Sequence, residues 1–275
     1  MTRRLPWTSL LLFVALAYAI TWLAWLPGIL QHKSIFSVSM PLTLLGGFGP
    51  AIAAVLTAAL TEGRPGVQWL GRRLVAWRVP LRWYAVALLL PLTIGVGAMA
   101  VAMLRTGQFP GFRAPAGDGT GAMILTVLTA FLIQMLLTGG NEELGWRGFA
   151  LPGLQAKMGA LPATLVLAGI WAVWHWPLFV MVGTSHATIP FWFFLLFTFP
   201  LTTLFTWVHN GSGGSVLLVM ILHGAVNATA EYLKIGMLST NMLLVWAVMA
   251  VVIVAAGWRK WMDRRLPEAP VDRAA

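Results

Sequence analysis

The sequence predicts an all-α fold, a polytopic membrane helix bundle of about eight transmembrane helices plus one amphipathic helix. Hydrophobic residues make up 59% of the 275 residues and charged residues only 9%, whereas roughly a quarter of the residues in a soluble domain are charged. The mean hydropathy is +0.82. The apolar residues also gather in runs close to the roughly 20 residues that a helix needs to cross a bilayer. We therefore expect residues 1–275 to form a single integral membrane domain.

The first apolar run tests this prediction, because Arg3 and Arg4 precede it and give it the look of a signal peptide. The run continues to Leu30, which is longer than a typical signal-peptide core, so we interpret it as a retained span. Prolines inside later runs predict helix ends or kinks, which membrane helices tolerate when neighbouring groups satisfy the freed carbonyls. The eight expected spans are residues 8–30, 40–61, 83–104, 121–141, 162–182, 191–208, 214–231 and 241–258.

The basic residues support an even number of spans. With eight spans, fourteen of the 18 Lys and Arg residues fall on the side of the two termini. Cytoplasmic loops carry such an excess, so we expect both termini to be cytoplasmic. The net charge of +10 then reflects residues that flank spans, and we expect contacts with membrane lipid and none with nucleic acid. The absence of cysteine excludes disulfides, a thiolate nucleophile and cysteine metal ligands.

Residues 66–79 predict an amphipathic helix on the cytoplasmic leaflet. Val67, Leu70, Leu74 and Trp77 recur at helical spacing, while three arginines lie off that stripe. Such a basic, one-sided helix is typical of a membrane-surface anchor.

Two adjacent carboxylates, Glu142 and Glu143, are the first candidates for chemistry, because charge at membrane depth is costly and usually functional. Glu143 and Arg147 are four residues apart and share a helix face, so we expect them to form an ion pair. Neighbours on a helix point about 100° apart, which leaves Glu142 as the freer carboxylate and a candidate general base. The alternative is an ion-paired helix end at the cytoplasmic interface, where Arg147 reaches toward water.

Two later apolar runs carry possible partners. His175 follows Trp171 by four residues, and His223 precedes Asn227 by four, so each pair lies on one helix face. A packed core histidine, or an interhelical hydrogen-bonding pair, explains each motif taken alone. His186 and His209 are expected at the membrane interfaces. Straight helices would place Glu142 near the cytoplasmic end of span four and the histidines deeper, so the groups can meet only if span four bends or a cavity opens. That position also favours substrate access from the cytoplasmic side.

If the groups meet, two mechanisms are open. Glu142 and His175 can activate a water for attack on a carbonyl, while His223 and Asn227 donate to the developing oxyanion. Alternatively, Glu142, His175 and His223 can bind a divalent metal such as zinc that activates the water. The sequence has no H-E-x-x-H motif and no G-x-S-x-G motif.

The ordered motifs Glu142-Glu143-x-x-x-Arg147, Trp171-x-x-x-His175 and His223-x-x-x-Asn227 resemble the CPBP family of intramembrane proteases. This family includes CAAX prenyl endopeptidases and bacterial Abi-type, bacteriocin-processing or self-immunity proteins. The resemblance covers residues 120–230. It implies peptide-bond hydrolysis in a cavity of a helical bundle. Glu142 and His175 would activate the water, and His223 and Asn227 would form the oxyanion site. Glu143 and Arg147 would support that geometry. Family members often have Phe where this chain has Trp171.

The resemblance also implies a bacterial plasma-membrane location and a peptide or protein substrate, possibly lipidated. Two other function classes stay open. One is a proton-coupled transporter that uses Glu142 and the histidines as a relay, although transporters commonly show repeats that this chain lacks. The other is a non-catalytic bacteriocin-immunity protein that keeps the fold.

Overall fold

The computed structural model describes residues 5–34, 37 and 39–257, and these form an all-α bundle, as the sequence predicted. Within this part of the chain, the pairing of Phe112 with Leu233 is an isolated β-bridge outside any strand. The longer helices are α1 (Trp7–Leu30), α3 (Met40–Gly47), α4 (Gly49–Leu74), α5 (Leu81–Thr106), α6 (Thr120–Leu136), α8 (Leu151–Met158), α9 (Ala160–Trp174), α11 (Phe191–Gly211), α12 (Val216–Tyr232) and α13 (Thr240–Ala256).

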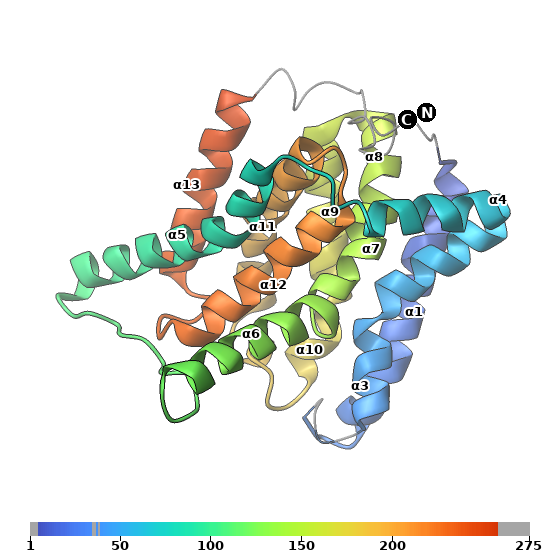
Figure 1. The fold of residues 1–275 in the computed structure, drawn as a ribbon. Coiled ribbons are helices and arrows are strands. Elements are labelled where there is room, and N and C mark those ends of the chain that lie inside the picture. The colour runs from blue at the N-terminus through green and yellow to red at the C-terminus, as the bar shows by residue number, and fades with distance from the viewer. Residues whose placement is uncertain (1–4, 35–36, 38, 258–275) are drawn as a thin grey trace.

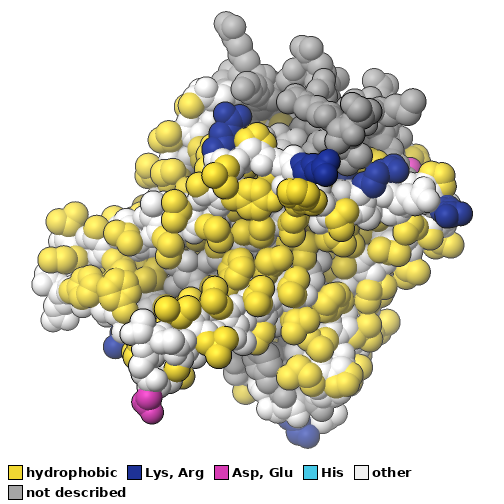
Figure 2. Space-filling model, in the orientation of Figure 1, with side chains coloured by type: hydrophobic (Ala, Val, Ile, Leu, Met, Phe, Trp, Pro, Cys, Tyr) yellow, Lys and Arg dark blue, Asp and Glu magenta, His cyan; other side chains and the backbone are white. Residues whose placement is uncertain are grey.

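The helices run between two faces of the molecule. α1 begins and α13 ends at the same face, at the top of Figure 1. We call it the basic face, because the exposed Arg64, Arg72, Arg78 and Arg82 lie on or next to the helix ends there. We call the opposite side the far face; it is formed by residues 31–34, 107–119, 181–190 and 233–239. In Figure 2 basic side chains edge the upper rim, and hydrophobic side chains cover much of the surface below them.

In the part of the chain that the structure describes, five helical segments are long and apolar enough to cross a membrane, or six if the bent pair α3 and α4 counts as one span. The helices α12 and α13 are also apolar but have only 17 residues each. Each of the eight predicted apolar stretches therefore contains a helix, although residues 137–139, 181–182 and 214–215 are not helical and two of the helices are short for a span.

The predicted amphipathic helix is only partly right. Residues 66–74 continue α4 beyond a kink at Gly63, whose φ of 64° is the left-handed backbone that glycine favours. The helix then ends at Leu74, so Trp77 lies outside it and is exposed. Arg73 is buried and donates to His209 Nε2 at 2.7 Å. This arginine faces the protein, because a buried acceptor on α11 lies within its reach.

The predicted end of span four at residue 141 is wrong, and this error matters most for function. The helical path continues to Met158 through a 3-10 turn (Gly140–Glu142), α7 (Glu143–Gly145) and a π-helical turn (Trp146–Ala150). The break begins at two glycines, which are poor helix formers. Gly140 packs against the Met135 carbonyl so closely that a Cβ at this position would collide with it. The glutamates thus lie in the middle of a broken helix and not at its cytoplasmic end.

Candidate active site

The predicted site residues surround one cavity. Its volume is about 500 Å³, and its lining includes Glu142, Trp171, His175, His223 and Asn227. These side chains come from the broken segment after α6, from the end of α9 and from the middle of α12. The depth mismatch expected for straight helices is removed by the break, which places Glu142 beside the last turn of α9.

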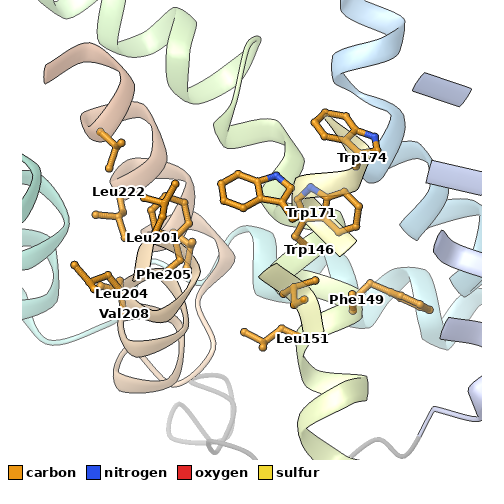
Figure 3. Close-up of a cluster of buried hydrophobic side chains, with 14 of the residues drawn as sticks. Trp146, Phe149, Leu151, Trp171, Trp174, Leu201, Leu204, Phe205, Val208 and Leu222 are labelled. Atoms are coloured by element: carbon orange, nitrogen blue, oxygen red, sulfur yellow. The ribbon is translucent and has the colours of Figure 1, made fainter. Parts of the chain in front are cut away.

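Two tryptophans hold the Glu142 carboxylate in place. Trp171 Nε1 donates to Glu142 Oε2 at 2.9 Å, and Trp146 Nε1 donates to the same oxygen at 3.3 Å. Figure 3 shows the nitrogen edges of these two indoles turned toward the same region. Both donors reach Oε2, so Oε1 is left without a protein donor among the described residues. The second oxygen is therefore free to accept a hydrogen bond from a water in the cavity.

The hydrogen bond at His175 Nδ1 fixes the tautomer of the neutral ring. Nδ1 lies 2.7 Å from the carbonyl oxygen of Trp171. A carbonyl can only accept, so Nδ1 carries the hydrogen and Nε2 keeps its lone pair. The ring packs edge-on against Trp174, with 4.7 Å between the ring centroids. His175 thus presents a fixed ring with one nitrogen able to accept a proton.

Glu143 joins two distant parts of the site. Arg147 Nη1 donates to Glu143 Oε1 at 2.9 Å, which confirms the predicted pair. His223 Nδ1 donates to the same oxygen at 2.7 Å. Glu143 and Arg147 are fully buried, so the alternative in which Arg147 reaches toward interfacial water is wrong. The guanidinium carbon instead lies 4.8 Å from the centre of the Trp171 ring, an arrangement that stabilises a buried cation.

His223 Nε2 and the Asn227 amide lie beside each other against Gly139. A Cβ built on Gly139 would be 2.6 Å from Asn227 Nδ2 and 2.9 Å from His223 Nε2. Asn227 Nδ2 also lies 3.4 Å from Gln134 Oε1, a long hydrogen bond that leaves the amide largely available. The two nitrogens therefore form a pair of potential donors to one substrate atom, and the missing side chain at Gly139 gives them room.

The side chains named as possible metal ligands do not fit that task. Among the described residues, no three His, Asp or Glu side chains gather closely enough to hold a metal ion. The Trp171 ring contacts both His175 and His223, at centroid distances of 5.3 and 5.9 Å. The Trp171 N–H also donates a hydrogen bond to Glu142 Oε2. The three groups are thus arranged around an indole and not around a shared metal position.

The sequence reasoning missed several residues of the site. Trp146 is four residues after Glu142, so helical spacing was a usable signal. Gln134 is a polar residue in an apolar run, which is a second signal. His186 gave none, because it lies in a loop. Its ring stacks on His175 at 5.4 Å and lines the cavity, and burial lowers its pKa to about 4. His209, which the sequence placed at a membrane interface, is buried in the protein and accepts a hydrogen bond from Arg73.

Comparisons with known proteins place this chain near one family of proteases. Residues 124–229 match the profile of a family described as type II CAAX prenyl endopeptidase, Rce1-like. The chain is also 26% identical over 234 residues to CAAX prenyl protease 2 of Methanococcus maripaludis, which covers 82% of this chain and 84% of that protein. The matched range contains every residue of the site described above. The family resemblance predicted from the Glu, His and Asn motifs is confirmed.

Proposed function

We propose that this protein is an intramembrane endopeptidase of the CAAX prenyl protease type, which cleaves a peptide bond with a water activated by Glu142 and His175. The observation that carries the proposal is the convergence of Glu142, His175, His223 and Asn227 on one cavity inside a membrane helix bundle. Hydrolysis needs a base beside a water and donors beside the carbonyl oxygen, and these four side chains offer both.

The first step is attack by water. Glu142 Oε1 takes a proton from the water, and the water oxygen forms a bond to the carbonyl carbon as the carbonyl π electrons move to oxygen. The two indole donors hold the carboxylate so that it need not reorient during this transfer. His175 Nε2 is the second acceptor that can orient the water, because Nδ1 is committed to the Trp171 carbonyl. General base catalysis of this kind contributes roughly 10²–10⁴-fold.

The second step is collapse of the tetrahedral intermediate. Asn227 Nδ2 donates to the oxyanion at any pH, whereas His223 Nε2 donates only when both ring nitrogens carry hydrogen. The Glu143 carboxylate accepts a hydrogen bond from His223 Nδ1 and orients the ring, and Arg147 holds Glu143 in place. The proton taken by Glu142 then passes to the leaving nitrogen as the C–N bond breaks. The products are a carboxylic acid and an amine, and the site returns to its starting state.

The substrate is a membrane-associated peptide or protein. The cavity has an aromatic and aliphatic lining, including Trp25, Leu44, Leu137 and Phe197, which suits an apolar segment or a lipid-modified tail. The name of the Methanococcus relative supports prenylated, CAAX-like tails as one class of substrate.

The test compares membrane peptides from cells that carry the wild type, Glu142→Gln or Glu231→Gln. Glu231 is an exposed carboxylate at the end of α12 and serves as the matched control. We expect cleavage products that disappear only with Glu142→Gln, and a fall of at least about 10²-fold in rate when the identified peptide is given to the purified variant. Full activity of purified Glu142→Gln would exclude this mechanism.

A further inference from the structure

The loop between α10 (Trp176–Val180) and α11 belongs to the far face and forms one wall of the cavity. Its residues in the lining are Gly183, Thr184, Ser185, His186, Thr188 and Ile189. Two of its hydroxyls hold the loop in shape. Thr184 Oγ1 donates to the Leu178 carbonyl of α10, and Thr188 Oγ1 donates to the Ser185 carbonyl at 2.7 Å. The loop is thus fastened to α10 and to itself, which gives its side chains fixed positions beside the cavity.

Three neighbouring rings hold the His186 ring. It lies nearly parallel to the His175 ring, with 5.4 Å between the centroids and 22° between the planes. Phe194 and Phe179 contact it edge-on, at centroid distances of 4.9 and 5.4 Å. Aromatic pairs at such distances attract each other. The plane of the His186 ring is therefore set by packing, without any use of its two nitrogens.

The ring nitrogens of His186 are available to a ligand. Among the described residues, none forms a hydrogen bond with either nitrogen, and the surrounding protein leaves both accessible. The pKa of about 4 keeps the ring neutral at pH 7. A neutral imidazole has one N–H donor and one nitrogen acceptor. His186 can therefore pair with either the N–H or the carbonyl of a peptide backbone.

Most other polar groups of the lining are already engaged. The four threonine hydroxyls of the lining donate to protein acceptors; they belong to Thr43, Thr138, Thr184 and Thr188. Ser239 Oγ accepts from the Met242 amide at the start of α13, and Ser185 is an exposed residue of the loop. The lining contains no Lys or Arg. Outside the four groups of the proposed reaction, His186 is therefore the polar side chain whose fixed position and free nitrogens best suit a ligand.

We propose that His186 is a substrate-binding residue that hydrogen-bonds the peptide backbone next to the scissile bond. This inference rests on the proposed protease function and adds a binding residue to that site. An extended chain rises about 3.3 Å per residue, so the 5.4 Å between the His175 and His186 rings spans one to two residues of substrate. A backbone group that enters an apolar cavity without a partner is costly. His186 supplies that partner beside the residue that orients the water.

His186→Phe tests this role, because phenylalanine keeps a ring against His175 but removes both nitrogens. A hydrogen bond made equally in the ground state and the transition state lowers KM and leaves kcat unchanged. With a synthetic prenylated CAAX-like peptide we therefore expect KM to rise roughly tenfold and kcat to stay within about twofold.

His32→Asn is the control for loss of a histidine. His32 is exposed and outside the lining, and its φ of 49° is a left-handed value that asparagine tolerates. Both constants should match the wild type in this control. A purely structural role of His186 would lower kcat through loss of folded protein and leave KM unchanged. That result, or a KM within twofold of the wild type, overturns the proposal.

Binding without cleavage provides the second arm. Fluorescence anisotropy of the labelled peptide gives Kd for purified Glu142→Gln and for the same protein carrying His186→Phe as well. We expect Kd to rise roughly tenfold when the imidazole is removed. Equal affinities, or no binding by either protein, overturn the assignment. If the wild type cleaves no peptide while the affinity depends on His186, the protease function fails and the binding role of His186 stands.

Discussion

Replacing Gly139 by alanine tests whether His223 and Asn227 act as a pair of donors. The new Cβ would lie 2.6 Å from Asn227 Nδ2 and 2.9 Å from His223 Nε2, whereas ordinary contact begins at 3.4 Å. The two nitrogens must therefore retreat by about 0.8 Å and about 0.5 Å, and a displacement near 1 Å at a reacting group costs roughly 10²-fold.

The expected result is a fall of roughly 10² in kcat with a smaller change in KM, because oxyanion donors act mainly on the transition state. Steady-state kinetics on the purified protein with its identified peptide measure both constants. Gly169→Ala is the matched control, since no atom lies within 4 Å of a Cβ there and alanine suits a helix. If Gly139→Ala folds and keeps kcat within about twofold of the control, the donor pair is not part of the mechanism.

Four further outcomes are expected. Arg147→Met leaves the buried Glu143 without its ion pair and lowers the free energy of unfolding by about 3–5 kcal/mol, measured by denaturation in detergent; an unchanged midpoint refutes this. Trp171→Phe keeps a ring but loses the indole donor to Glu142, so kcat falls by roughly tenfold or more in the same kinetic assay, and no loss would show that this hydrogen bond is dispensable. Because the folded pKa of His186 is about 4, its unfolded ring binds a proton below about pH 6.5 that the folded ring does not. Lowering the pH from 7 to 5 should then destabilise the wild type more than His186→Phe, and equal falls in their thermal midpoints argue against a neutral ring in the folded protein. Titration with EDTA should leave the rate unchanged, whereas loss of activity that zinc restores would favour the metal mechanism.

Local spacing predicted those parts of the site that depend on one helix. Glu143 and Arg147 are four residues apart and form the expected ion pair. His223 and Asn227 are likewise four residues apart, and both line the cavity. A helix places residues i and i+4 on one face whatever surrounds it, so these relations could be inferred without knowing the fold.

Relations between helices could not be inferred in this way. Glu143 and His223 are 80 positions apart and share a hydrogen bond only because α12 packs beside the broken segment. The straight-helix argument failed at Gly139 and Gly140, where the chain leaves α6 and then turns through 3-10 and π-helical geometry. Irregular backbone at membrane depth is tolerated where neighbouring protein surrounds it, and the sequence does not state those neighbours.

Composition and hydropathy by themselves determined an all-α membrane bundle, because a bilayer requires each spanning segment to be apolar and to satisfy its own backbone hydrogen bonds. The order of the Glu, His and Asn motifs likewise indicated the family. Only the tertiary structure decided that Glu142 lies deep in a broken helix, that Trp146 and Trp171 hold its carboxylate, and that the cavity is bordered by far-face loops. The physical reason is that hydropathy depends on residue type alone, whereas depth, donor partners and access depend on how separate helices pack.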